Sequence, residues 1–123
     1  MIQATGRTVL VVDDQDELRA MLVRVLAGDG YRVLEARDGF EALEVLETEP
    51  EVSLVVTDLL MPRMDGLELA RHLAGRSNIQ ILFMSACPDQ VSELPFAFLP
   101  KPFSPATLCA AVQRLLAPSQ MQA

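Results

Sequence analysis

The sequence has little positive charge, few aromatic residues and no long hydrophobic run. Its 10 lysines and arginines against 17 acidic residues give a formal net charge of −7, which argues against binding to the phosphate backbone of nucleic acid. No apolar stretch approaches the roughly 20 residues needed to cross a bilayer, and the N-terminus lacks the layout of a secretory signal. We therefore expect a cytoplasmic protein that contacts neither nucleic acid nor membrane directly.

Cysteine and histidine are too sparse for a zinc site or a disulfide framework. Cys87 and Cys109 lie far apart with no partner at metal-ligand spacing, which is typical of reduced, packed thiols. His72 is the only histidine, and its position on the exposed side of a short helix is typical of a surface residue. Neither residue type predicts a catalytic role.

Length and composition predict one globular domain. A chain of 123 residues suffices for a single core, and 50% hydrophobic with 22% charged residues is a globular profile. We expect residues 1–123 to form one domain with an ordered core of about 7–117.

Short apolar, β-branched runs alternate with one-sided amphipathic segments along the chain. The expected strands are residues 8–12, 31–36, 52–57, 79–84 and 96–99, and the expected helices lie around 18–26, 40–46, 67–74 and 108–116. Capping boxes are expected where an aspartate precedes a glutamate by three residues, and a Ser-Pro start is expected for the last helix. These starts are Asp14/Glu17, Asp38/Glu41, Asp65/Glu68 and Ser104-Pro105.

The alternation of strands and helices predicts a doubly wound α/β fold, with a parallel sheet and helices on both faces. Sites in such sheets form at the carboxyl ends of the strands, where the strand order reverses. If the order is 2-1-3-4-5, Asp13 and Asp14 at the end of the first strand meet Asp58 at the end of the third. Three carboxylates in one crevice raise each other's pKa or recruit a hard cation such as Mg²⁺.

Each of these residues taken alone has a simpler explanation. Asp14 is compatible with a helix cap, Asp58 with turn chemistry and Lys101 with a solvated surface position. However, four motifs occur in register over nearly the whole chain: Val11-Val12-Asp13-Asp14, residues 57–66 (TDLLMPRMDG), Ser85-Ala86 and Lys101-Pro102. Together they resemble the receiver domain of bacterial response regulators, which implies a five-stranded, flavodoxin-like (CheY-like) sheet of order 2-1-3-4-5.

The resemblance implies a phosphoacceptor rather than an enzyme with a separate substrate. Asp58 would accept a phosphoryl group from a phosphohistidine on a sensor histidine kinase or a histidine phosphotransfer protein. Mg²⁺, or Mn²⁺ in its place, would be held by Asp13, Asp14, Asp58 and the backbone carbonyl of Leu60.

The resemblance also assigns the groups that would bind the phosphoryl oxygens. These are the side chains of Lys101 and Ser85 and the backbone amides of Leu59 and Ala86. Ser85 would act as the switch hydroxyl together with Phe98, whose alternative role is simply to fill the core.

Two further expectations come from the resemblance. The Lys101–Pro102 peptide bond would be cis, an isomer that X–Pro bonds adopt at small cost. Docking of the kinase would use the start of the first helix, around Gln15 and Leu18, and the loop at Pro102 and Phe103.

The segment of residues 86–100 departs from the family pattern. It is several residues too short for a complete fourth helix, and Pro88 and Pro95 bracket only a handful of residues. We expect this helix to be absent or shortened, which puts in doubt the usual dimer face of fourth helix, fifth strand and fifth helix. The residues around Ser85 and Lys101 look more like receivers attached to hybrid sensor kinases, and we expect no output domain in this chain.

Two other functions remain as alternatives. A haloacid-dehalogenase-like phosphatase would use Asp14 as its nucleophile, with Asp16 completing an aspartate pair, but no acid follows Glu93 to supply the late acidic residues of those enzymes. An interaction module that keeps the fold without phosphorylation is the other alternative.

Overall fold

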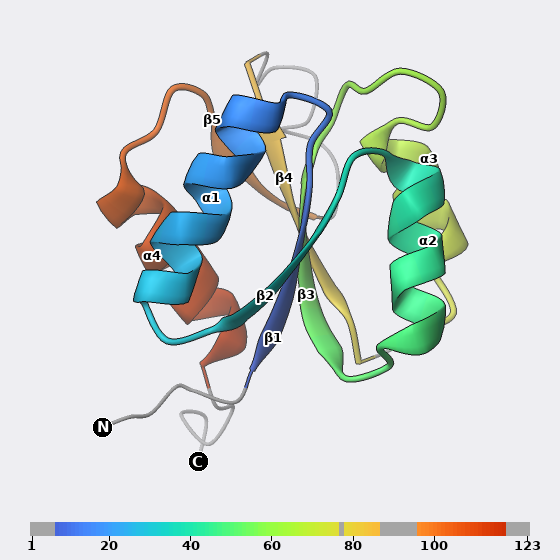
Figure 1. Cartoon of the computed structure of the whole chain (residues 1–123), viewed down its shortest axis with the longest axis horizontal. Coiled ribbons are helices and arrows are strands. Elements are labelled where there is room, and N and C mark those ends of the chain that lie inside the picture. The colour runs from blue at the N-terminus through green and yellow to red at the C-terminus, as the bar shows by residue number, and fades with distance from the viewer. Residues whose placement is uncertain (1–6, 77, 87–95, 118–123) are drawn as a thin grey trace.

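The computed structural model describes residues 7–76, 78–86 and 96–117, which form a five-stranded parallel sheet with helices on both faces (Figure 1). The strands are β1 (Thr8–Val12), β2 (Arg32–Ala36), β3 (Val52–Asp58), β4 (Gln80–Ser85) and β5 (Ala97–Pro100). The helices are α1 (Asp16–Gly28), α2 (Gly39–Thr48), α3 (Gly66–His72) and α4 (Pro105–Leu116). The strand order β2-β1-β3-β4-β5 confirms the predicted doubly wound α/β fold.

The sheet has a hydrophobic core on each face. Helices α1 and α4 cover one face, and α2 and α3 cover the other (Figure 1). Side chains of β1 alternate between them, because Val9 and Val11 pack under α1 and α4 while Leu10 and Val12 pack under α2 and α3. A central strand buried on both faces has to be apolar nearly throughout, which explains the sequence of β1.

Three helices begin with a side-chain cap at the predicted residue, but of the two predicted capping boxes there, only that of Asp65 and Glu68 at α3 is complete; at α2 the Glu41 carboxylate accepts from the Arg37 N–H instead. At α2, α3 and α4 the residue before the helix accepts a hydrogen bond from the backbone N–H three positions on. These cap residues are Asp38, Asp65 and Ser104.

The start of α1 differs from the prediction. The capping box of Asp14 and Glu17 is wrong, because α1 begins at Asp16 and its N-cap residue makes no side-chain cap bond. That residue is Gln15, whose backbone N–H instead donates to the Asp13 carboxylate over 2.8 Å. Asp14 is exposed at the end of β1, and its carboxylate is not used as a cap.

Most predicted segments match the described helices and strands to within one or two residues. The predicted absence or shortening of a helix between β4 and β5 falls on residues 87–95, which lie outside the described residues, as does Cys87. His72 is exposed on α3, as predicted, and Cys109 is a half-buried free thiol on α4. None of the helices in the described part of the chain is long and apolar enough to cross a membrane.

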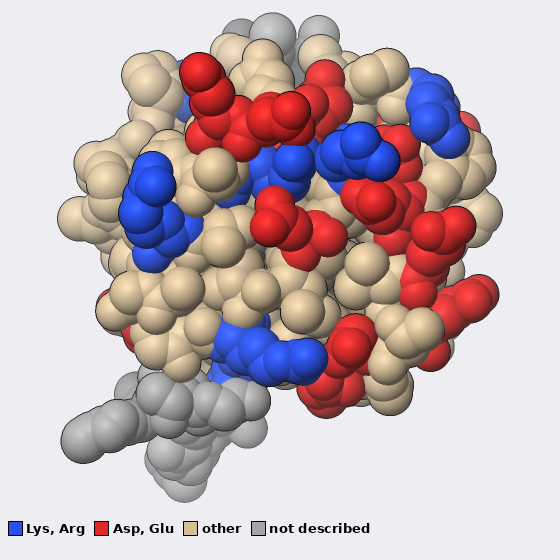
Figure 2. All heavy atoms as spheres, viewed as in Figure 1, with Lys and Arg blue, Asp and Glu red and all other residues tan. Residues whose placement is uncertain are grey.

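Acidic side chains dominate the surface over α2 on the face shown in Figure 2, with basic side chains between the acidic groups. The outer side of α2 contributes Glu44 and Glu47, both exposed. The described residues form no continuous basic stripe on this face.

Gly66, the first residue of α3, lies against the end of β3. A Cβ atom at this position would be 2.6 Å from the Asp58 carbonyl oxygen and 3.1 Å from a ring carbon of Phe83. The Gly66 N–H donates to the Leu59 carbonyl oxygen over 2.9 Å, which keeps the two backbones in close contact. The close packing of α3 on the strand that ends in Asp58 therefore requires glycine here.

We predict that Gly66→Ala lowers the free energy of unfolding by about 1–3 kcal/mol, because the added methyl group overlaps backbone that cannot move independently. Urea unfolding followed by far-UV circular dichroism measures the change. Gly28→Ala is the matched control, because nothing lies within 4 Å of a Cβ there. Equal stability of the two variants would contradict the prediction.

Candidate functional site

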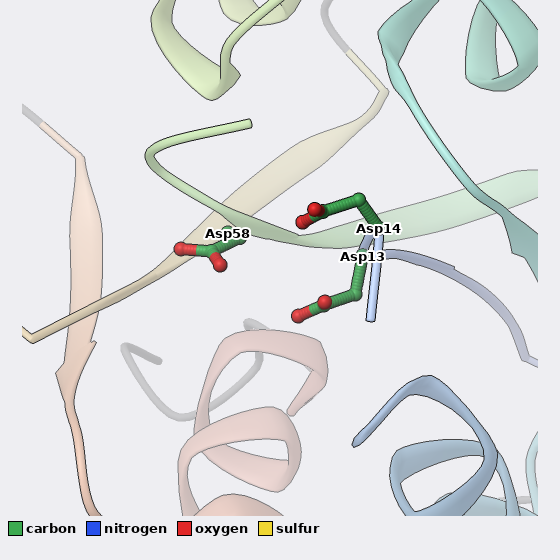
Figure 3. Close-up of side chains that lie close together, drawn as sticks. All are labelled: Asp13, Asp14 and Asp58. Atoms are coloured by element: carbon green, nitrogen blue, oxygen red, sulfur yellow. The ribbon is translucent and has the colours of Figure 1, made fainter. Parts of the chain in front are cut away.

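Three aspartates converge at the carboxyl ends of two neighbouring strands. Asp58 is the last residue of β3, and Asp13 and Asp14 directly follow β1. Since β1 and β3 are adjacent and parallel, these ends meet at the point where the strand order reverses. One carboxylate oxygen of each residue lies within 4.8 Å of those of the other two (Figure 3). The structure thus brings together the three acids that the sequence singles out.

Asp13 is the most buried of the three acids. Its exposed fraction is 0%, and while one carboxylate oxygen accepts the Gln15 N–H, the other, Oδ2, makes no hydrogen bond among the described residues. Burial raises the pKa of Asp13 above its ordinary value, and the Gln15 bond opposes this. The negative charge of Asp58 raises the pKa further, Lys101 lowers it, and Asp14 adds a smaller upward contribution.

Lys101 provides the positive charge of the site. Its ammonium Nζ donates to Asp58 Oδ2 over 3.1 Å, and both side chains are mostly buried. Its backbone N–H donates to the Ser85 carbonyl oxygen at the end of β4 over 2.7 Å. The Lys101–Pro102 peptide bond is cis, the isomer that the resemblance implies.

The donor set suits a hard divalent cation. All three clustered side chains offer carboxylate oxygens, which are the ligands that Mg²⁺ prefers. A buried carboxylate oxygen without a partner, as at Asp13 Oδ2, is what a bound ion or water would satisfy. With all groups ionised, three carboxylates and one ammonium leave two negative charges, which one divalent cation neutralises.

The strands β3, β4 and β5 bring the expected phosphoryl-binding groups to the same edge of the sheet. Ser85 ends β4 with its side chain buried, and Ala86 follows it in an exposed position. The assignment of the Leu59 amide is corrected by the structure, because this N–H donates to the Met84 carbonyl oxygen over 3.0 Å. The contact between β3 and β4 thus continues one residue beyond Asp58 and occupies that donor.

Phe98 is half-buried on β5, where it packs against Leu59, Ala70 and Phe83. This position fits both a core role and a side chain that changes its exposure, so its switch role stays a prediction.

The residues expected to dock a kinase lie near the ends of α1 and β5. Gln15 and Pro102 are exposed, while Leu18 and Phe103 are half-buried and pack against the core under α1 and α4. Only part of this group is therefore open to a partner in this conformation.

Two arginines with specific contacts, Arg19 beside the site and Arg63 in the loop after β3, were not identified from the sequence. The Arg19 side chain is only 13% exposed, and its guanidinium donates to the backbone carbonyl of Asp13. The signal for it was present, since Arg19 precedes Leu22 by three residues on the buried side of α1, where a charged residue needs partners. Arg63, in the loop after β3, has φ 73°, which is uncommon for a residue other than glycine, and its guanidinium lies over the Phe40 ring.

Comparison with known proteins assigns the chain to a family. The sequence profile described as "Response regulator receiver domain" matches residues 9–113. Over 117 residues the chain is 41% identical to the sensor kinase CckA of Brucella abortus, a match that covers 89% of this chain and 12% of that kinase. The chain belongs to the response regulator receiver domain family, and it spans only a small part of this relative.

Solved structures agree with this assignment. The receiver domain of the hybrid histidine kinase CckA is similar with a TM-score of 0.77 and 35% identity, covering 89% of this chain and 98% of that one. The response regulator TrrA from Thermotoga maritima, solved in complex with Mg(2+)-BeF, is similar with a TM-score of 0.80 and 29% identity, with the same coverage of 89% and 98%.

The raised pKa of Asp13 predicts a pH-dependent stability. The folded protein holds this proton more tightly than the unfolded chain, so the metal-free protein should lose stability as pH rises from the ordinary value of 3.8 through the folded pKa. Asp13→Asn removes this loss. In the presence of a chelator it should be more stable than wild type at neutral pH, and the difference should shrink as pH falls toward 3.8.

Urea unfolding at a series of pH values measures this difference. Glu44→Gln, at an exposed position of α2, serves as the control and should change stability little at any pH. A stability difference between wild type and Asp13→Asn that does not vary with pH would contradict the prediction.

Proposed function

We propose that Asp58 receives a phosphoryl group from the phosphohistidine of a sensor histidine kinase or a histidine phosphotransfer protein. The observation that carries this proposal is the Lys101 ammonium 3.1 Å from the Asp58 carboxylate, at the edge where Asp13 and Asp14 also converge. A carboxylate is a weak nucleophile toward an anionic phosphoryl group, so positive charge must surround the site of attack. Membership of the receiver domain family supports the same role.

A divalent cation, Mg²⁺ or Mn²⁺, completes this proposal. Asp13, Asp14 and Asp58 would hold it, with the backbone carbonyl of Leu60, two residues after the acceptor, as a further ligand. When bound, it would neutralise charge on the phosphoryl oxygens and on the attacking carboxylate. The unpartnered Oδ2 of Asp13 supports a cation in this crevice.

The transfer itself exchanges one bond for another. An oxygen of Asp58 forms the O–P bond as the P–N bond to the donor imidazole breaks, and the imidazole nitrogen keeps the bonding pair and takes up a proton. Lys101 would then pair with a phosphoryl oxygen, while the Ser85 hydroxyl and the Ala86 amide would bond others. The acyl phosphate replaces the Asp58–Lys101 ion pair, and this change would be transmitted through Ser85 and Phe98.

The product is a signalling state of the protein rather than a released compound. We therefore propose a phosphorelay role in which the chain catalyses its own phosphorylation and slow hydrolysis, and no reaction on a separate substrate. It would act as a single receiver domain in the cytoplasm, where the kinase phosphohistidine is found.

We predict that a small phosphoramidate with Mg²⁺ adds one phosphoryl group to the wild-type protein, because it carries the same P–N bond as phosphohistidine. Intact-protein mass spectrometry would detect the added mass, and hydroxylamine should remove it as expected for an acyl phosphate. Asp58→Asn should abolish the modification. Asp29→Asn, at the opposite end of α1, should leave it unchanged.

Modification that persists in Asp58→Asn would contradict the proposal. Turnover of a small phosphate ester that is lost in Asp14→Asn but kept in Asp58→Asn would favour the phosphatase alternative instead.

A further inference from the structure

Arg19 is a largely buried cation that joins three elements next to the acidic site. Its guanidinium donates through Nη1 to the Asp13 carbonyl oxygen over 2.8 Å. Nη2 donates to Asp16 over 2.7 Å, and Nε donates to Glu35 over 2.9 Å. One side chain therefore ties the end of β1 to the first turn of α1 and to β2.

Asp13 is fixed at each of its polar atoms except one. Its N–H donates to the Ala36 carbonyl oxygen over 3.1 Å, its carbonyl oxygen accepts from Arg19, and its Oδ1 accepts from Gln15. The remaining atom is the buried Oδ2. Of these three partners, Arg19 alone contributes a side chain.

The hydrogen bond from Arg19 is made to the peptide unit that joins two residues of the acidic cluster. The Asp13 carbonyl belongs to the peptide bond that links Asp13 to Asp14, two of the three acids in the cluster. Because a peptide unit is planar, a bond to its oxygen fixes the orientation of the whole unit and constrains the backbone of both residues. Charge-assisted bonds of this kind are stronger than neutral ones.

We propose that Arg19 is a positioning residue for the cation site, which holds the Asp13–Asp14 peptide unit so that both carboxylates face Asp58. This inference rests on the proposed function, because it takes the three carboxylates to bind a divalent cation. Arg19 acts through the backbone and is not a ligand, since a guanidinium has no lone pair to offer a cation.

Removal of Arg19 should change Mg²⁺ affinity in opposite directions, depending on whether Arg19 acts only through its charge or by positioning the ligands. A positive guanidinium near the site repels a divalent cation, so its removal should tighten Mg²⁺ binding if only charge matters. If Arg19 positions the ligands, its removal should weaken Mg²⁺ binding even though a repulsive charge has gone. Loss of a group that orients metal ligands typically weakens metal affinity by about 10- to 100-fold.

The chain offers a matched control for the loss of a paired arginine. Arg32 lies on β2 and also forms two ion pairs, with Glu49 over 3.1 Å and Glu51 over 2.6 Å. In the described part of the chain its guanidinium pairs with these two glutamates and not with the acidic cluster, so Arg32→Gln removes the same charge and the same number of ion pairs without touching the Asp13 carbonyl.

The test is isothermal titration of Mg²⁺ into the full chain without any phosphate, for wild type, Arg19→Gln and Arg32→Gln. We expect Arg19→Gln to bind Mg²⁺ about tenfold more weakly than wild type. Arg32→Gln should stay within about twofold, because exposed charges at a distance are screened. A second readout is amide hydrogen exchange of Asp14 and Gln15 in the metal-free protein, which should be faster in Arg19→Gln only.

Arg19→Lys keeps the positive charge and serves if Arg19→Gln does not fold. It should also bind Mg²⁺ more weakly, because one ammonium does not reproduce the planar fork that reaches three acceptors.

The outcomes separate this inference from the function on which it rests. Unchanged or tighter Mg²⁺ binding by folded Arg19 variants, with normal binding by wild type, would overturn the positioning role alone. Absence of Mg²⁺ binding by wild type would overturn the cation site and the positioning role together.

Discussion

Repulsion between three carboxylates at one edge of a parallel sheet is the interaction around which the rest of the site is arranged. Asp13, Asp14 and Asp58 are close because β1 and β3 are neighbours that end at the same level. Lys101 offsets part of this charge from the end of β5, and burial of Asp13 makes the remainder more costly. The site therefore favours positive charge, which a divalent cation supplies, and this is also the condition for attack on a phosphoryl group.

The surrounding fold keeps these groups in place through short backbone contacts. Gly66 lets α3 pack directly on the Asp58 carbonyl, and the Leu59 amide is held by Met84 of β4. At the end of β1, the Arg19 side chain of α1 bonds to the Asp13 carbonyl oxygen and to Glu35 of β2, and so joins these three elements. A phosphoryl group on Asp58 would replace its ion pair with Lys101, so that a local change of charge would reach several elements at once.

Much of the fold was predictable because its signals are local. Alternation of buried strands with amphipathic helices is visible in the sequence, and the acids at the ends of β1 and β3 follow from topology. The predictions that were wrong concern residues whose bonding depends on tertiary contacts. Asp14 carries a cap pattern, but its carboxylate belongs to the acidic cluster and caps no helix. The Leu59 amide is occupied because it bonds to the Met84 carbonyl oxygen of β4.

Two partners of Arg19 were beyond prediction for the same reason, since Glu35 lies on β2 and the Asp13 carbonyl follows β1, whereas Arg19 lies on α1.

Binding of beryllofluoride, a phosphoryl mimic, tests the central claim most directly, because it requires the acceptor, the cation and the lysine together without a kinase. Fluorine NMR would follow binding to the wild-type protein with and without Mg²⁺, and to Asp58→Asn. The account predicts saturable binding that depends on Mg²⁺ and on Asp58. Binding that persists without Mg²⁺ or in Asp58→Asn, or no binding by wild type under any condition, would contradict it.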